Sequence, residues 1–397
     1  MFLQKLMLHN FRCFKDIEVN FHPQLTVLAG INGSGKSSLL EGAAIALSSL
    51  FIKMSQLSAR KIDKEQAHLE SFAYGTTRDM QAQYPVIISA EAAMDSNSPA
   101  STIRWTRSLS SPQGQTLYRE AKEITSLGAD YQKRVRQGDT GLLLPLFAYY
   151  GTGRVWDYHR RKQGDVFPRN NRLGGYVDCL DGTANVKLMT NWFTKMTVQK
   201  YQNQELGIDR VPELEAVLVA LENCYRRITG YPETKIQFRL ATRQFEVAYR
   251  NERGVAMRLP INHLSDGYKC TISLVADIAY RMAVLNPQLA DEVCTATEGI
   301  VLIDEIDLHL HPNWQARILS DLTEIFPRVQ FIVTTHAPSV LNSVKSENVL
   351  LLEGREVFSP SDEVHGRDVL SASTSTNCGR QTLTNRAPEL LLRLEFP

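Results

Sequence analysis

The chain has 397 residues, of which 43% are hydrophobic and 22% charged, enough apolar content for one large domain or two ordinary ones. Its formal net charge of +1 excludes the global positive field of many nucleic-acid-binding proteins, although a local basic patch stays open. The six cysteines include no C-x-x-C pair, which argues against a zinc knuckle or a disulfide framework and favours a reduced, cytoplasmic setting.

The N-terminal region predicts two paired strands, because apolar residues alternate over residues 2–8 and again over residues 16–21. His9 and Arg12 follow too soon for a secretory signal peptide. No run in the chain approaches the roughly 18–20 apolar residues of a membrane helix. We therefore expect a cytoplasmic protein that has no membrane contact.

A glycine-rich motif lies between the next predicted strand and a predicted helix. Residues 30–37 read GINGSGKS, the G-x-x-x-x-G-K-[ST] pattern of a phosphate-binding P-loop. The apolar run 25–29 precedes it, and residues 38–47 follow with helical spacing. The glycines let successive N–H groups point at phosphate oxygens, and the helix N-terminus adds positive charge. Lys36 is expected to reach the β- and γ-phosphates, and Ser37 to ligate Mg²⁺.

The region after the P-loop helix predicts more strands. Residues 84–91 and 101–109 predict strands of an antiparallel side sheet, and residues 142–150 predict a buried strand. Residues 52–82 are polar and mixed, and we expect them to be helical in part.

Two amphipathic helices are predicted at residues 184–200 and 212–227, followed by strands within residues 235–249. At ~1.5 Å per residue each helix is about 25 Å long, too short for a long coiled-coil arm. A basic stretch with interleaved aromatic residues precedes them. This stretch indicates either contact with nucleic acid or a loop that is solvated, binds nucleotide or binds a partner protein. Its residues are Arg154, Trp156, Tyr158, His159, Arg160, Arg161, Lys162, Arg169 and Arg172.

The second half contains two further motifs with the chemistry of a nucleotide site. Residues 264–269, LSDGYK, open a predicted helix; they are typical of an ordinary capped helix or of a turn whose free N–H groups meet a phosphate. The apolar run 300–303 ends in Asp304 and Glu305. A carboxylate at a strand end can hold Mg²⁺, and its neighbour can act as general base for the attacking water.

Histidines mark the two segments that follow. His309 and His311 are two residues apart, which is weak support for zinc without a further Cys/His cluster. Residues 334–338, TTHAP, follow a predicted strand, and His336 is placed to hydrogen-bond a γ-phosphate.

The order of GINGSGKS, LSDGYK, LIDE and TTHAP resembles that of ABC-type ATPase heads, in the branch of the SMC, RecF and Rad50 proteins and the OLD nucleases. Asn-Phe-Arg-Cys-Phe at residues 10–14 is similar to the N-F-R-x-F start of that branch, and DEIDLHLHP to its DEP-x-x-x-L-H-P segment. LSDGYK departs from the family's L-S-G-G-Q at Asp266 and Tyr268. The resemblance implies an α/β fold, an ABC-type (RecF/SMC-like) P-loop ATPase head with an antiparallel side sheet and a short helical insertion.

The resemblance also implies an Mg²⁺-dependent ATPase in which two heads enclose two ATP molecules head to tail. Glu305, Lys36 and His336 would be catalytic, and Ser37 and Asp304 would ligate the metal. The nucleotide-binding residues it implies are Arg12, Gly30, Asn32, Gly33, Ser34, Gly35, Lys36, Ser37, Ser38 and, from the second head, Ser265 and Gly267.

A narrower resemblance rests on LFAYYGTGR at residues 146–154 together with these motifs. It is to the stand-alone ATPases of bacterial anti-phage systems, such as the PtuA family of Septu, also found beside retrons. It implies a self-associating ATPase that regulates a separate nuclease or toxin, such as an HNH nuclease, with DNA or retron nucleic acid as a further partner.

A RecF-like repair ATPase that binds DNA is the alternative to this interpretation. An OLD-type nuclease would need an acidic TOPRIM cluster, for which residues 354–397 are too short, and the start and L-H-P segments disfavour a transporter. We expect residues 1–156 and 255–358 to form a bipartite head and residues 157–254 an insertion. Residues 359–397 are expected to be a poorly ordered tail.

Overall fold

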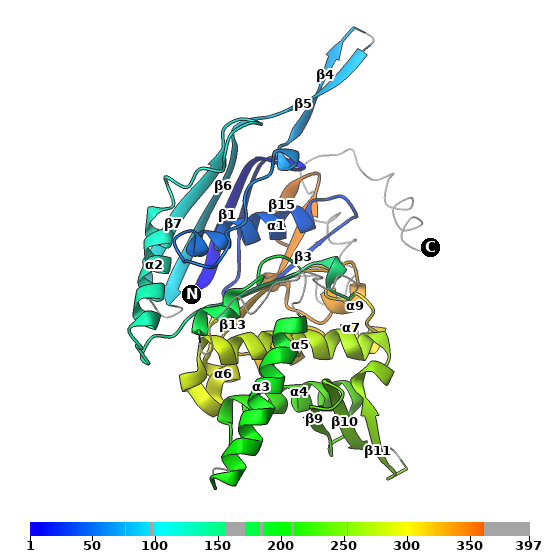
Figure 1. Ribbon diagram of the computed structural model, residues 1–397. Helices are drawn as coiled ribbons and strands as arrows, with labels where there is room; N and C mark the ends of the chain where they lie inside the picture. The colour runs from blue at the N-terminus through cyan, green and yellow to red at the C-terminus, as the bar shows by residue number, and fades with distance from the viewer. Residues whose placement is uncertain are drawn as a thin grey trace.

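The computed structural model describes residues 1–75, 77–95, 98–155, 171–182, 186–207, 210–251 and 253–360 (Figure 1). These residues form sheets of six, four, three and two strands. None of the helices in this part of the chain has the length and apolarity that a bilayer crossing requires. The expected C-terminal tail and most of the basic stretch fall outside the described residues.

The central sheet has the strand order β15-β14-β3-β13-β12-β8. All its strands run parallel except β15, which pairs antiparallel with β14. Each residue of β12 and β13 is buried, as expected of parallel strands covered on both faces. The strands in chain order are β3 (Leu25–Gly30), β8 (Leu146–Tyr150), β12 (Gly299–Ile303), β13 (Val329–Thr334), β14 (Val349–Glu353) and β15 (Glu356–Phe358).

The predicted antiparallel side sheet is present, with the order β2-β1-β6-β7. Helix α1 (Lys36–Leu47) is buried between this sheet and the central one, where Trp105 Nε1 donates to the carbonyl of Ala46 at 2.9 Å. The side sheet therefore holds α1 in place, and the P-loop runs into the N-terminus of this helix. Its strands are β1 (Phe2–Phe11), β2 (Phe14–Asn20), β6 (Val86–Asp95) and β7 (Ser98–Leu109).

Residues 52–82 differ from the prediction. Apart from one 3-10 turn at Lys64–Gln66, their regular structure is a hairpin of β4 (Leu69–Tyr74) and β5 (Thr77–Ala82), which projects from the molecule in Figure 1. Almost every hairpin residue is exposed, so no buried face imposes an apolar alternation on the sequence. Helix α2 (Lys122–Arg136), which was not predicted, packs against the turn at Ser48–Phe51.

The chain between β8 and α5 contains two helices and a three-stranded antiparallel sheet of order β11-β10-β9, of which β11 lies beyond the expected insertion of residues 157–254. Phe193 of α3 stacks on Phe238 and meets Phe245 edge-on, which joins the helix to the sheet. Helix α4 packs along α5, the helix that follows the sheet (Figure 1). The elements are α3 (Val186–Glu205), α4 (Pro212–Thr229), β9 (Lys235–Arg239), β10 (Gln244–Arg250), β11 (Ala256–Pro260) and α5 (Asp266–Leu285).

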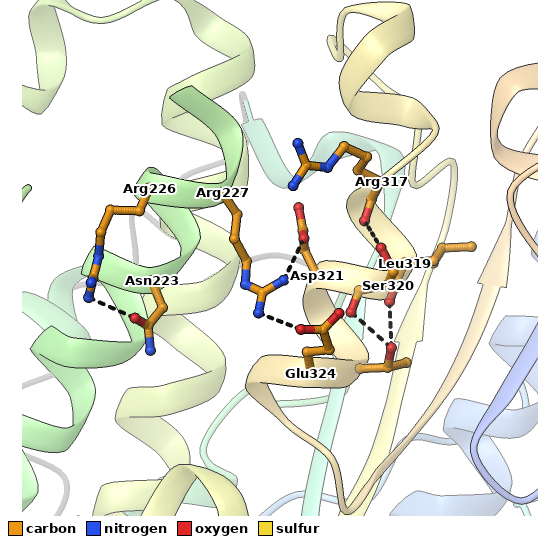
Figure 2. A network of polar contacts seen from close by, with 9 residues as sticks. Asn223, Arg226, Arg227, Arg317, Leu319, Ser320, Asp321 and Glu324 are labelled. Atoms are coloured by element: carbon orange, nitrogen blue, oxygen red, sulfur yellow. Dashed lines mark hydrogen bonds and ion pairs between the residues drawn. The ribbon is translucent and has the colours of Figure 1, made fainter. Parts of the chain in front are cut away.

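Two helices follow β12, α7 (Pro312–Gln315) and α8 (Ile318–Ile325), separated by non-helical backbone at Arg317. Short helices α6 (Val293–Ala296) and α9 (Pro338–Leu341) complete the described chain. Figure 2 shows how α8 is tied to α4, where Arg227 pairs with Asp321 at 3.2 Å and with Glu324.

Candidate nucleotide site

Three motifs meet at one edge of the central sheet. The P-loop follows β3, the TTHAP segment follows β13, and Asp304 and Glu305 follow β12. These strands are parallel, and β13 lies between the other two. Their carboxyl ends therefore meet at the same edge, about 5 Å apart from strand to strand. The topology assembles one site from segments near residues 30, 304 and 336.

The P-loop conformation depends on glycine at two positions. Gly35 has φ +106°, and a Cβ there would lie 2.3 Å from Cζ of Phe14. Gly30 has φ +154°, and a Cβ there would lie 2.4 Å from the carbonyl oxygen of Leu352. Both positions combine left-handed backbone with close packing, so a side chain would displace the loop.

Lys36 lies inside the loop. Its Nζ donates to the carbonyl oxygens of Gly30 at 2.8 Å and Ile31 at 3.0 Å, and only 5% of the residue is exposed. Burial lowers the pKa of Lys36, and this is opposed by Asp304, Glu305 and Asp307. The ammonium group therefore lies within the electrostatic influence of the carboxylates at the end of β12.

The loop fits a phosphate group. Ser34 Oγ is buried and has no hydrogen-bond partner within the described chain, so an anion at the loop would satisfy it. Asn32, Gly33 and Ser37 are exposed, and Ser38 is half-buried. A buried cation, an unsatisfied hydroxyl and a loop of exposed backbone form the donor set that phosphate oxygens need.

Two threonines hold the carboxylates at the end of β12. Thr334 Oγ1 donates to Asp304 Oδ1 at 2.6 Å and accepts from the backbone N–H of Glu305 at 2.7 Å. Thr335 Oγ1 donates to Asp307 in the same way. These threonines had no predicted role, because their function depends on β13 lying beside β12. Only the TTHAP motif itself could have drawn attention to them.

Glu305 occupies the left-handed region, with φ +48°. Such backbone in a residue other than glycine is uncommon and recurs at functional sites. Asp304 is 4% exposed, whereas Glu305 is half-buried. The fixed, buried Asp304 suits a metal ligand, and the more open Glu305 suits a base that meets water.

His336 is half-buried near the same groups. Burial and then the charge of Lys36 lower its pKa, while Asp307 and Asp304 oppose the change. The imidazole is therefore neutral at pH 7, and it can donate one hydrogen bond and accept another.

Arg12 is held by helix α1. Its guanidinium pairs with Glu41, which also accepts from Gln66 Nε2 at 2.8 Å and pairs with Arg60 at 3.3 Å. The backbone N–H of Arg12 donates to the carbonyl of Gln66 at 2.6 Å. The structure thus places Arg12 in a polar cluster beside α1, in contact with Glu41, a partner that the sequence did not predict.

The LSDGYK segment begins α5. Ser265 occupies the N-cap position and is exposed, but its hydroxyl makes no capping hydrogen bond to α5. Gly267 is buried, and a Cβ there would lie 2.7 Å from the carbonyl oxygen of His309. The ring of Tyr268 lies 4.3 Å from that of Trp314. The segment therefore packs on the residues that follow Asp304 and Glu305, with Ser265 left facing solvent.

The remaining predicted polar residues have other roles. His309 is exposed, and His311 Nδ1 accepts from the N–H of Asn313 at 3.4 Å at the start of α7. The described ranges contain no group of three or more His, Cys, Asp or Glu side chains that could hold a metal. Arg172, from the basic stretch, donates to the carbonyl oxygens of Leu285 and Leu142, so its role is structural.

Sequence comparison gives related ATPases. A family model described as an AAA domain matches residues 5–228. The chain is 26% identical to the Retron Vc95 probable ATPase of Vibrio cholerae serotype O1 biovar El Tor, over 93% of this chain and 78% of that protein. It is also 26% identical to the Retron Ec83 probable ATPase of Escherichia coli, over 90% of this chain and 73% of that protein. A Septu protein PtuA of Bacillus mycoides (strain KBAB4) is 45% identical, but over 24% of this chain and 13% of its own length.

Structural comparison gives the fold. An SMC head crystallised with the C-winged helix domain of ScpA superposes with a TM-score of 0.53 at 16% identity, covering 90% of this chain and 98% of that one. An SMC head with a coiled coil and joint from Pyrococcus yayanosii gives 0.50 at 12% identity, covering 94% and 99%. Since the family model spans more than half of the chain, the chain belongs to the AAA domain family, with the fold of an SMC-like ATPase head and sequence kinship to retron ATPases and Septu PtuA.

Proposed function

We propose that this protein is the ATP-binding and ATP-hydrolysing subunit of a bacterial anti-phage defence complex of the Septu or retron kind. Nucleotide-dependent association of two heads regulates a partner nuclease or toxin. The observation that carries the proposal is the assembly of Lys36, Asp304, Glu305 and His336 at one sheet edge. The retron ATPases, which match over most of both chains, support the defence role.

Each residue of the site has a distinct task in the proposed reaction. Lys36 exchanges its two carbonyl contacts for phosphate oxygens, and Ser34 gains the partner that it lacks. Ser37 and Asp304 would hold Mg²⁺, which neutralises phosphate charge when bound. Glu305 accepts a proton from the attacking water, and neutral His336 donates a hydrogen bond to the terminal phosphate.

The proposal assigns residues 1–156 and 255–358 to the head and residues 157–254 to an insertion. Two strands of the central sheet, β3 and β8, come from the first segment, and the other four come from the second. The RecF-like alternative has less support, because the RecF of Ligilactobacillus salivarius (strain UCC118) matches over only 10% of this chain.

Steady-state hydrolysis separates the tasks of these residues. We expect Lys36→Ala to lose nucleotide binding, and Glu305→Gln to bind ATP normally while hydrolysis falls at least about 100-fold. Phosphate release and equilibrium binding of a fluorescent ATP analogue measure the two effects. Normal hydrolysis by Glu305→Gln would remove the base assignment. Purification with the proteins of neighbouring genes, followed by phage challenge, tests the defence role.

A further inference from the structure

We infer that a cavity beside the sheet β9–β11 is a second anion site, which binds a small phosphate-bearing ligand such as a nucleotide. The cavity of about 470 Å³ lies between α4 and the sheet β9–β11. Sites for small molecules commonly have about 300–1,000 Å³. Its charged lining residues are Arg226, Lys235, Arg250, Arg258, Glu222 and Glu233.

The cavity carries more positive than negative charge. Two cations are neutralised, because Lys235 pairs with Glu222 at 3.3 Å and Arg250 pairs with Glu233 at 2.7 Å. Arg258 is exposed, and its side chain has neither an ion-pair nor a hydrogen-bond partner among the described residues. One guanidinium is therefore available for an incoming anion without breaking an existing bond.

Arg226 supplies the second cation without an acidic partner. Its Nη2 donates to the neutral amide oxygen of Asn223 at 2.7 Å, and its Nε donates to the carbonyl oxygen of Glu222 at 3.3 Å. Figure 2 shows that Arg226 and Arg227 point in different directions from α4, and that only Arg227 reaches the acidic pair on α8. Arg227 therefore binds α8, whereas Arg226 of the same helix lines the cavity.

The strand register produces a concave, basic surface. Ala248 of β10 lies directly opposite Lys235 of β9 on one side and Arg258 of β11 on the other. Residues opposite one another in a sheet point to the same face. The small Ala248 therefore forms a floor between two long cationic side chains. Arg250 faces Ala256 in the next row, which repeats the pairing of a cation with a small residue.

Aromatic contacts connect this sheet to the start of α5. The ring of Tyr249 lies 5.9 Å from that of Tyr225, which lies 5.8 Å from Tyr268. The ring of Tyr268 in turn lies 4.3 Å from that of Trp314, a residue of the segment that follows Asp304 and Glu305 in the chain. Tyr225 belongs to α4, so a ligand that draws α4 toward the sheet would also move the Tyr225 ring relative to those of Tyr249 and Tyr268. We therefore expect occupancy of the cavity to change the ATPase rate.

Pyrophosphate binding to the full chain tests the site. In the Lys36→Ala background, where the P-loop does not compete, isothermal titration at constant ionic strength should detect pyrophosphate. Arg258→Ala should weaken that binding about tenfold, since a charge-assisted hydrogen bond is lost. Arg243→Ala is the matched control: Arg243 is an exposed arginine in the β9–β10 turn, outside the cavity lining, and its loss should leave the affinity unchanged.

Three results would overturn the inference. The first is binding of neither pyrophosphate nor a short single-stranded oligonucleotide to the Lys36→Ala protein, and the second is equal loss of pyrophosphate binding in the two arginine variants. The third is binding of the oligonucleotide but not of pyrophosphate, which would indicate a nucleic-acid surface instead.

The regulatory part has its own readout. Pyrophosphate should change the ATPase rate of the protein with an intact P-loop, and this change should shrink in Arg258→Ala. Equal inhibition of the wild-type protein and the Arg258→Ala variant would show that pyrophosphate acts at the P-loop, and would overturn the inference that the cavity regulates the ATPase. Failure here is distinct from failure of the proposed ATPase function, because basal hydrolysis without pyrophosphate is measured in the same experiment.

Discussion

At the scale of single residues, two P-loop glycines allow the energetic cost of backbone strain to be distinguished from the cost of a steric clash. Gly35 has φ +106° and would place a Cβ 2.3 Å from the Phe14 ring, whereas Gly33 has φ +80° with nothing within 4 Å. Gly33→Ala should cost about 1–3 kcal/mol of unfolding free energy through strain alone. Gly35→Ala should cost more and should also abolish nucleotide binding, because Phe14 must move. Urea unfolding and ATP binding measure both effects, and equal costs at the two positions would contradict the clash argument.

The lowered pKa of His336 gives a pH dependence with a definite sign. Burial and Lys36 keep the folded imidazole neutral below the pKa of about 6.5 that the unfolded chain has. As the pH falls through 6.5, the unfolded state binds a proton that the folded state does not, so stability decreases. Between about pH 7.5 and 5.5, the melting temperature of the wild type should drop more than that of His336→Asn. A parallel fall in both proteins would show that His336 is not the responsible group.

At the scale of elements, the sequence predicts best what depends on local pattern. The P-loop between β3 and α1, and the carboxylates at the end of β12, follow from apolar runs bounded by motif residues. The hairpin β4–β5 could not be predicted in this way, because its residues face solvent on both sides. Contacts between elements were also missed. The bond from Thr334 to Asp304 requires knowing that β13 lies beside β12, and the pair of Arg12 and Glu41 requires the packing of β1 on α1.

Helix α5 is anchored to the central sheet by a buried ion pair. Arg281 Nε donates to Asp277 Oδ2 at 2.7 Å, and their side chains are 2% and 1% exposed. Tyr150 OH donates to the same carboxylate oxygen at 2.8 Å, and Arg281 also donates to the carbonyl oxygens of Gly175 and Val177. Burial lowers the pKa of Arg281, but Asp277 together with Tyr150, Cys179 and Tyr280 raises it above its usual value, so the guanidinium stays charged. The pair joins α5 to β8 and to residues 175–177.

Removing Asp277 should therefore leave an uncompensated buried cation. We expect Asp277→Ala to lower the unfolding free energy by about 3–5 kcal/mol, and the double variant with Arg281→Met to recover part of that loss. Asp266→Ala is the control, because it removes the exposed pair with Lys269 on the same helix, worth about 0–1 kcal/mol. Denaturant unfolding of the four proteins measures these values. Similar costs at Asp277 and Asp266 would mean that the buried pair does not anchor the helix.

At the scale of the whole molecule, the two parts of the proposed composite site lie apart in the described chain. Lys36 and the carboxylates gather at the edge of the central sheet, while Ser265 faces solvent at the start of α5. Gly267 and Tyr268 pack on the segment that follows the carboxylates, which gives the proposed head association a contact between the site and the start of α5. Two heads related by a twofold axis would each offer Ser265 to the other's P-loop.

This arrangement predicts ATP-dependent association. Since Glu305→Gln is expected to retain bound ATP, addition of MgATP should raise its molar mass in light scattering, and ADP should not. Adding Ser265→Arg should abolish the increase while ATP binding stays intact, because an exposed residue can change without unfolding the head. Thr242→Arg, at an exposed turn of the insertion sheet, adds the same charge and should leave the increase unchanged. A mass that is independent of ATP would show that the P-loop acts without a second head, and an equal rise with Ser265→Arg would show that Ser265 does not lie in the interface.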